Sequence, residues 1–308
     1  RIAVPDLVSN SYFPIIAAVE MGFFKEEGFD ATVDLLFPIP KTFEALRDGA
    51  LDFVVGSAHA TLLAFPEWQG AKLLAACGQH TYWFLVIRSD LKPQRGDLSI
   101  VKGLRIGAAP GVNLSLQRML VEAGIDPDKN NVQIMPIPGA AGPNVSFGLS
   151  AAKALEAGTL DGFWANGMGC EVAVRRGVGA MVLDIRRGDG PTVARHYTFS
   201  ALVATDKTIK DDPAAARAAV RALMKAHKAL KQDPTRATAV GQKRFPASEA
   251  ELIAELVRRD LPYYDPTIPP EKVESMNRFA QDIGLLKAPA AYDQVVATQF
   301  SHLWNEAV

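Results

Sequence analysis

The sequence contains little of what several common kinds of site require. Of its 308 residues, two are cysteines and five are histidines. Cys77 and Cys170 fall in different halves of the chain, so we expect two buried free thiols rather than a disulfide. Cysteines and histidines this few, at no recognised metal-binding spacing, also predict no metal site and no cofactor.

Charge and hydropathy exclude further classes of protein. The chain has 33 lysines and arginines against 34 aspartates and glutamates, a net charge of -1. No basic surplus is available to neutralise phosphates, so nucleic-acid binding is not expected. The longest apolar run, Phe84–Ile87 with its flanking aromatics, is far shorter than the roughly 20 residues of a membrane span. Because the chain begins at Arg1 and not at methionine, we expect a mature form whose signal peptide has been removed.

Sequence motifs of common enzyme classes are also missing. There is no Gly-x-Ser-x-Gly nucleophile elbow, no Walker A sequence and no His-Glu-x-x-His. The segment 107–111 lacks the spacing of a dinucleotide loop, and Pro110 removes a backbone donor where a phosphate would need one. His59 and His80 remain as candidate general bases. An enzyme that uses one of them is the alternative from a different functional class, although we expect no catalytic residue.

A repeated pattern organises the chain. Ala45–Ser57 reads as a helix end, a glycine stop, a buried strand and a polar tip, and Ala154–Asn166 repeats this pattern 109 positions later with Ala, Leu, Gly, Leu and Asp in register. Arg1–Pro5 also resembles Arg105–Pro110. The repeated aspartate begins the strand, so we expect it to fix the turn between helix and strand. Two similar halves predict two similar lobes, with the two polar tips on opposite walls of a cleft.

Strands that alternate with helices predict an α/β fold of two doubly wound lobes, with a ligand cleft between them. A chain of this length also favours two domains. Polar segments rich in proline and glycine at 90–97 and 186–191 are predicted to cross between the lobes. The first lobe would then be discontinuous, comprising residues 1–89 and 192–308 and finished by C-terminal helices. Residues 90–191 would form the second lobe.

In doubly wound lobes, ligands bind beyond the carboxyl ends of the strands. Helices predicted to begin near Ser11, Ser57, Asn113 and Ser146 would present free N–H groups and positive dipole ends there, which can hold an anion without a basic side chain. Aromatic rings of Tyr12, Phe13, Trp83, Phe147 and Trp164 are expected beside them. The candidate ligand contacts are Asn10, Tyr12, Ser57, His59, Gln79, His80, Trp83, Asn113, Ser115, Asn144 and Asn166.

The chain resembles a known family over essentially its whole length. The segments Glu20–Phe29, Ala45–Asp52 and Ala154–Gly162 are similar to substrate-binding proteins of bacterial ABC importers with the type II periplasmic-binding fold. Within that fold they resemble the NMT1/THI5-like branch, which contains sulfonate, taurine, nitrate and thiamine-pyrimidine-precursor binders. The resemblance implies a periplasmic or lipid-anchored receptor, expected to be a monomer, that closes on a small molecule by a hinge motion and delivers it to an ABC permease in the inner membrane.

The resemblance leaves the ligand open. Helix N-termini beside aromatic rings favour a small organic anion, a carboxylate or sulfonate with an aromatic or apolar body. A neutral heteroaromatic such as a thiamine pyrimidine precursor is the alternative. Many relatives carry an acidic residue and proline where this chain has Asn166, which argues against a partner for a ligand amine at that position. The cysteine cluster of the related pyrimidine synthases is absent, which argues against that enzymatic branch. A sensory or partner-binding module with the same clamshell is a third function.

Overall fold

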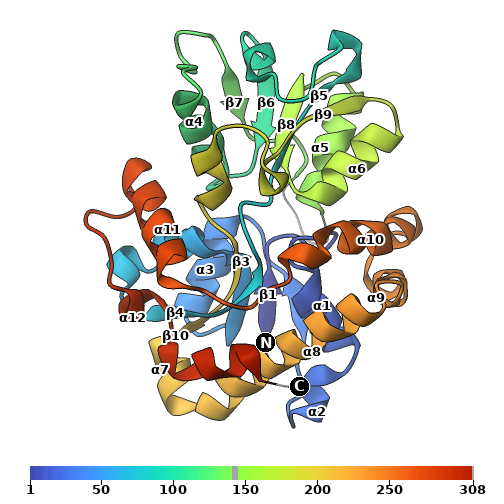
Figure 1. Ribbon diagram of the computed structural model, residues 1–308. Coiled ribbons are helices and arrows are strands. Elements are labelled where there is room, and N and C mark those ends of the chain that lie inside the picture. Colours follow the sequence, from blue (N-terminus) through green and yellow to red (C-terminus); the bar gives the residue numbers. More distant parts are fainter. Residues whose placement is uncertain (141–144, 307–308) are drawn as a thin grey trace.

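The computed structural model describes residues 1–140 and 145–306, which form two α/β lobes (Figure 1). Each lobe is built on a five-stranded sheet, with orders β2-β1-β3-β10-β4 and β7-β6-β8-β5-β9. The strands of the first sheet are β1 (Ile2–Val4), β2 (Val33–Leu35), β3 (Phe53–Ser57), β4 (Ala71–Gly78) and β10 (Ser200–Thr205). Those of the second are β5 (Phe84–Arg88), β6 (Arg105–Ala108), β7 (Gln133–Met135), β8 (Gly162–Ala165) and β9 (Gly179–Asp184).

Helices cover both sheets. In the first half of the chain they are α1 (Phe13–Glu20), α2 (Phe23–Glu26), α3 (Ile39–Arg47), α4 (Asn113–Glu122), α5 (Phe147–Glu156) and α6 (Gly167–Arg175). After β10 follow α7 (Asp206–Asp211), α8 (Pro213–Gln232), α9 (Arg236–Arg244), α10 (Ala247–Asp260), α11 (Pro270–Asp282) and α12 (Tyr292–Val295). The predicted α/β fold of two lobes, the first finished by C-terminal helices, is therefore confirmed.

The repeat seen in the sequence is also a repeat of structure. In each sheet, three parallel strands follow the same order: β1 lies between β2 and β3, and β6 lies between β7 and β8. Asp52 accepts a hydrogen bond from the backbone nitrogen of Arg1, and Asp161 accepts one from that of Arg105 at 3.0 Å. Hydrogen bonds from the Arg105 guanidinium lower the pKa of Asp161 to about 2. As expected, this aspartate fixes the entry to its strand.

The strand pairing corrects the predicted crossing between lobes. The sequence pattern predicts that the segment 84–88 belongs to the first lobe, with the crossing at 90–97. In the structure β5 pairs antiparallel with β8 and β9 and so belongs to the second sheet. The first linker is therefore 79–83, and the second linker, 185–199, returns the chain to β10. Each sheet thus contains one antiparallel strand. In the first sheet β10 lies between β3 and β4, and in the second β5 lies between β8 and β9.

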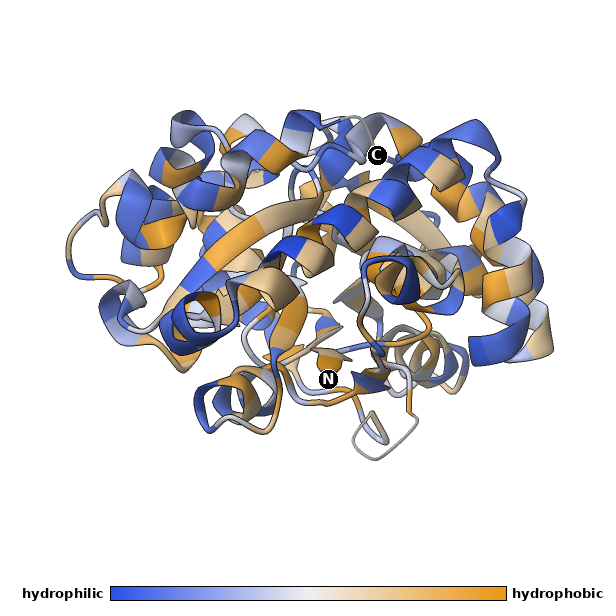
Figure 2. Cartoon of the chain, turned by 90° about the horizontal axis from the view of Figure 1, so that it is seen from below, coloured by the Kyte–Doolittle hydropathy of each residue, from blue (hydrophilic) through white to orange (hydrophobic). Residues whose placement is uncertain are grey.

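Apolar residues fill the interior of both lobes. Seen from below, the helices in front carry many hydrophilic residues (Figure 2). Helix α8 shows how local sequence fixes the start of a helix. It begins with Pro213 in its first turn and is capped by Asp212, whose carboxylate accepts from the N–H of Ala215 at 2.9 Å. Cys77 and Cys170 are free and buried, as expected. Within 1–140 and 145–306, no helix is both long and apolar enough for a membrane span.

Helix α10, in the C-terminal part of the chain, packs against α6 of the second lobe and reaches the second linker at its C-terminal end (Figure 1). On its surface, Glu255 and Arg259 form ion pairs with Arg175 and Glu171 of α6 at 2.6 and 2.7 Å. At its end, Asp260 is 3% exposed and sits between two arginines of the second linker. The Asp260 carboxylate accepts from Arg186 and Arg187, each at 3.0 Å, and from Asn10 at 2.7 Å.

Candidate functional site

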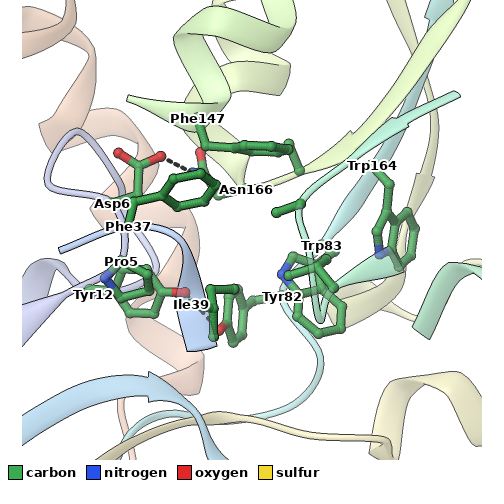
Figure 3. A pocket seen from close by; sticks show the side chains of 13 residues that line it. Pro5, Asp6, Tyr12, Phe37, Ile39, Tyr82, Trp83, Phe147, Trp164 and Asn166 are labelled. Carbon is green, nitrogen blue, oxygen red and sulfur yellow. Dashed lines mark hydrogen bonds between the residues drawn. The ribbon is translucent and has the colours of Figure 1, made fainter. Parts of the chain in front are cut away.

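A cavity between the two lobes encloses about 360 Å³ of space, part of it open to solvent (Figure 3). We call it the interlobe cavity. Its walls come from the loops that follow β1, β2 and β6, from the first linker, and from the start of α5 and the end of β8. It is lined by Pro5, Asp6, Tyr12, Phe37, Ile39, Tyr82, Trp83, Ala109, Val112, Phe147, Trp164, Ala165 and Asn166. Among these described residues there is one carboxylate and no lysine, arginine or histidine.

Asp6 is the charged group of the interlobe cavity. It follows the carboxyl end of β1 and is 4% exposed. One carboxylate oxygen, Oδ2, accepts hydrogen bonds from three donors of the other lobe: Ser146 Oγ at 3.1 Å, the Gly148 N–H at 3.3 Å and Asn166 Nδ2 at 2.9 Å. The other oxygen, Oδ1, accepts from the Val8 N–H at 3.1 Å. A carboxylate of the first lobe therefore accepts hydrogen bonds from a set of donors on the second lobe.

Burial is the largest influence on the pKa of Asp6. Loss of hydration raises the pKa of its carboxyl to about 6, and the four hydrogen bonds offset only part of that effect. An ordinary aspartate titrates near pH 4. Asp6 consequently changes charge close to neutral pH, where an ordinary aspartate stays ionised. This gives the interlobe cavity a titratable group that bridges the two lobes.

The donors around Asp6 are placed by two helix starts. Ser146 caps α5 and accepts from the Leu149 N–H, while Asn166 Oδ1 caps α6 by accepting from the N–H groups of Met168 and Gly169. The two helices approach closely at Gly148 and Gly169, because a Cβ on Gly169 would lie 2.7 Å from the Gly148 carbonyl oxygen. Two positive helix ends therefore meet beside one carboxylate.

Replacing Gly148 with alanine is expected to lower the free energy of unfolding. The added Cβ would lie 2.9 Å from Asn166 Oδ1 and 3.1 Å from the Gly169 nitrogen, so α5 and α6 must separate. Overpacking of this kind costs about 1–3 kcal/mol, of which higher helix propensity returns at most about 1. Urea denaturation measures the loss. Ser150→Ala, on the same helix and partly exposed, is the control with little expected change; a Gly148→Ala protein as stable as this control would contradict the close packing.

Aromatic side chains form the rest of the wall. Tyr12 and Tyr82 meet edge to face with 5.9 Å between ring centroids, and their hydroxyls lie 3.1 Å apart. Trp83 lies 6.0 Å from Trp164, and Phe37 lies 5.8 Å from Phe147 across the lobes. Burial raises the pKa of Tyr82 to about 12 and also raises that of Tyr12, so both phenols stay neutral. Six rings therefore offer apolar faces to an enclosed ligand.

Three of the candidate residues from the sequence line the interlobe cavity: Tyr12, Trp83 and Asn166. Two serines lie directly behind it. Ser57 Oγ is 2.6 Å from the Tyr82 hydroxyl and makes no helix-cap bond, and Ser115 Oγ accepts from Trp164 Nε1 at 3.0 Å. These serines hold aromatic side chains in place.

The other candidates lie elsewhere. Asn10 binds Asp260, and Asn113 Oδ1 accepts from the Gly111 N–H at 3.0 Å. Gln79 and His80 line a different cavity. Asn144 lies outside the described residues.

His59 is enclosed by protein and does not line the interlobe cavity. Its Nδ1 lies 3.0 Å from Thr198 Oγ1, and its ring meets those of Trp83 and Phe279 edge to face. Burial lowers the pKa of His59 to about 3, and burial followed by neighbouring cations lowers that of His80 to about 3 as well. At neutral pH both imidazoles are uncharged, and neither adjoins Asp6.

The sequence reasoning missed Asp6, Tyr82 and Phe37 as lining residues. Asp6 had a usable signal, because it is the second residue after β1 and so lies at the carboxyl end of a central strand. At the start of α5, where an anion site is expected, the structure places a protein carboxylate. The donors of that site exist, but the Asp6 carboxylate already accepts hydrogen bonds from them.

A model of the family described as NMT1/THI5 like matches residues 9–237 of the sequence. The chain belongs to this family. The match spans more than half of the sequence and includes both copies of the repeated motif, which confirms the resemblance stated above. Among curated proteins, none is significantly similar in sequence.

Solved structures of this family's fold cover nearly the whole chain. The periplasmic sulfonate-binding protein SsuA of Methylobacillus flagellatus KT is 19% identical with a TM-score of 0.66, covering 99% of this chain and 92% of its own. The periplasmic nitrate-binding protein NrtA of Synechocystis PCC 6803 is 15% identical with a TM-score of 0.71, covering 98% and 86%. The desulfurization enzyme DSZB is 14% identical with a TM-score of 0.65, covering 98% of each chain. The type II periplasmic-binding fold is therefore shared by binding proteins and an enzyme.

Proposed function

We propose that this member of the NMT1/THI5-like family is the substrate-binding receptor of an ABC importer. The proposal is supported by family membership, by the fold shared with sulfonate- and nitrate-binding proteins, and by the interlobe cavity. In this function the protein is an extracytoplasmic monomer whose lobes open to admit a small molecule, close around it by hinge motion and present it to a permease. Contacts from both lobes stabilise the closed form.

The ligand that the cavity favours is a flat aromatic compound, uncharged or weakly basic, with an N–H or O–H donor. One observation carries this choice: six aromatic rings surround a single carboxylate, and no cationic side chain is among the described lining residues. An aromatic body packs against the rings, while the free lone pairs of Asp6 Oδ1 can accept from the ligand. An anion would face the ionised carboxylate of Asp6 without a counter-charge.

A small organic anion is the second candidate, and a separate observation favours it. Ser146 Oγ, the Gly148 N–H and Asn166 Nδ2 converge on one point, which is the geometry of an oxyanion site at a helix start. A carboxylate or sulfonate on a ligand could replace the Asp6 oxygen there once Asp6 is protonated. Because the pKa of Asp6 is about 6, this exchange would become easier in mild acid.

Binding without turnover is supported by the chemistry of the buried groups. Burial raises the pKa of Cys77 to about 12 and also raises that of Cys170, and neither thiol lines the interlobe cavity. A thiol is a nucleophile only as the thiolate, so both cysteines are inert at neutral pH. The neutral His59 is held by Thr198 away from the cavity. Recovery of the bound compound unchanged after long incubation is the expected result, and product formation lost in His59→Ala would instead establish an enzyme.

Mass spectrometry of the compound that copurifies with the protein identifies the ligand, and calorimetry from pH 5 to pH 8 then tests its class. A donor ligand needs the ionised Asp6, so its affinity is expected to rise up to tenfold per pH unit below pH 6 and then level off. An organic anion is expected to show the opposite slope. In Asp6→Asn the affinity is expected to lose its pH dependence in either case. Trp83→Ala is expected to weaken binding but to leave the pH dependence unchanged. An affinity independent of pH, or unaffected by Trp83→Ala, would contradict binding in this cavity.

A further inference from the structure

A second cavity lies against both linkers, on the side of the first lobe that carries α11. We call it the linker pocket; it encloses about 1100 Å³ of space, part of it open to solvent. Gln79 and His80 of the first linker, Arg195 and His196 of the second, and Tyr263 and Lys272 of the C-terminal region line it. None of its lining residues lines the interlobe cavity, so the two cavities are separate.

Polar atoms in the linker pocket are left without partners. Gln79 is 5% exposed, and its Nε2 donates to the carbonyl oxygens of Asp265 and Thr267 at 2.7 and 2.9 Å. Its Oε1, together with His80 Nδ1 and Arg195 Nε, is buried with no hydrogen-bond partner within the described part of the chain. Such groups call for a missing partner: the Arg195 Nε–H is a donor that needs an acceptor, whereas Gln79 Oε1 is an acceptor that needs a donor. His80 is also held at a φ of 64°, a conformation that costs a residue other than glycine energy and is typical of functional sites.

Positive charge gathers at the His80 end of the linker pocket. Arg195 and Lys272 form no ion pair with any described residue, and the Lys272 ammonium lies 5.8 Å from the Phe199 ring centroid. Besides burial, the pKa of His80 is lowered by Lys272, Arg195, His196 and Arg186, all of them cationic or basic. Burial also lowers the pKa of Lys272, and the nearby Arg195 acts in the same direction.

The linker pocket also contains acidic groups, which limit how much charge it can neutralise. Asp265 and Glu271 line it, and both raise the pKa of Lys272. The Asp265 carboxylate is partly engaged, since Oδ1 accepts from the Thr267 N–H at 2.9 Å. The His196 ring lies 5.3 Å from that of His80, and Arg195 is the residue next to His196, so cationic and basic side chains gather around the two histidines.

We propose that the linker pocket binds a small oxyanion, a phosphate or a carboxylate group, between Arg195, Lys272 and His80. Arginine and lysine are the usual partners of such groups, and a neutral His80 with a proton on Nδ1 supplies a further donor. The bound anion would contact both linkers and α11 at once. Such an anion would lie where the two linkers join the lobes. This proposal does not depend on which ligand the interlobe cavity takes.

Nuclear magnetic resonance of the five histidines tests the proposal. Titration with sodium phosphate at constant ionic strength is expected to shift the ring signals of His80 and His196 saturably, and to leave those of His59, His227 and His302 unchanged. Sodium acetate in a second titration distinguishes a preference for phosphate from one for carboxylate, and either response supports the site. Sodium chloride at equal ionic strength is the blank.

Arg195→Gln and Lys272→Gln are each expected to weaken phosphate binding at least tenfold, whereas Lys129→Gln, on an exposed turn of the second lobe, leaves it unchanged. Circular dichroism checks that each variant is folded. Shifts that chloride reproduces, shifts that do not saturate, or equal affinity in the two variants and the wild type would overturn the proposal. Loss of ligand binding in the interlobe cavity would not, because the titration reads the linker pocket directly.

Discussion

Asp6→Asn is expected to raise the free energy of unfolding at pH 8 by about 2–3 kcal/mol. The pKa of Asp6 rises from 3.8 to about 6 on folding, and each unit corresponds to about 1.4 kcal/mol between the two protonation states. Above pH 6 the folded protein therefore carries an ionised carboxylate at a cost that the unfolded chain does not bear. Asparagine has nearly the same shape and no charge, so it removes this cost and keeps one oxygen for the donors of α5 and α6. Its NH2 group then faces the Val8 N–H, and the loss of that hydrogen bond returns about 1 kcal/mol of the gain.

The pH dependence gives this prediction its sign. Between about pH 4 and pH 6 the folded state retains a proton on Asp6 that the unfolded state has released, so the stability of the wild type falls as the pH rises through this window. The difference in unfolding free energy between Asp6→Asn and the wild type should grow across the same window and stay constant above it. Urea denaturation at five pH values measures this difference. Asp34→Asn, at an exposed position on β2, is the control; an Asp6→Asn protein less stable than the wild type at pH 8 would refute the argument.

Asp260→Ala is expected to cost about 3–5 kcal/mol of folding free energy. Asp260 and Arg186 are each 3% exposed, and Asp260 also accepts from Arg187 and Asn10. Removing the carboxylate leaves the buried Arg186 guanidinium without its counter-charge, which is among the most destabilising single changes a protein can undergo. Removing the carboxylate also removes the ion pairs that hold the end of α10 against the second linker.

Glu255→Ala on the same helix provides a matched comparison. Glu255 pairs with Arg175 and Arg259, but all three side chains are more than 40% exposed. Exposed pairs of this kind contribute at most about 1 kcal/mol. Thermal and urea unfolding of both variants should therefore differ by at least about 2 kcal/mol. Equal losses in the two would show that the buried cluster contributes no more than a surface ion pair.

Local sequence patterns were sufficient to predict most of the fold. Glycine stops after helices, short apolar strands and the repeated Leu-Asp pair are read from neighbouring residues, and the second copy at 154–166 confirmed that they belong together. The place of β5 could not be obtained this way. Its apolar residues suit the interior of either sheet, and only its contacts with β8 and β9, about 75 to 100 positions further on, decide between them.

The site was less predictable than the fold, for the same physical reason. Trp83 and Asn166 stand at strand ends, so the general rule for doubly wound lobes found them. The role of Asp6 depends on donors 140 to 160 positions away, and on the close crossing of α5 and α6 at two glycines. His59 has the residue type and position of a catalytic base, but its burial and its bond to Thr198 appear only when the chain is folded.

The position of β10 sets the order in which the two lobes can be completed during synthesis on the ribosome. The five strands of the second sheet lie within residues 84–184. In the first sheet, β10 lies between β3 and β4 and pairs with both. Until Ser200–Thr205 has left the exit tunnel, the nascent chain holds β3 and β4 with unpaired inner edges, which are exposed to association with other chains. The lobe that begins later in the sequence is thus the first whose sheet can close.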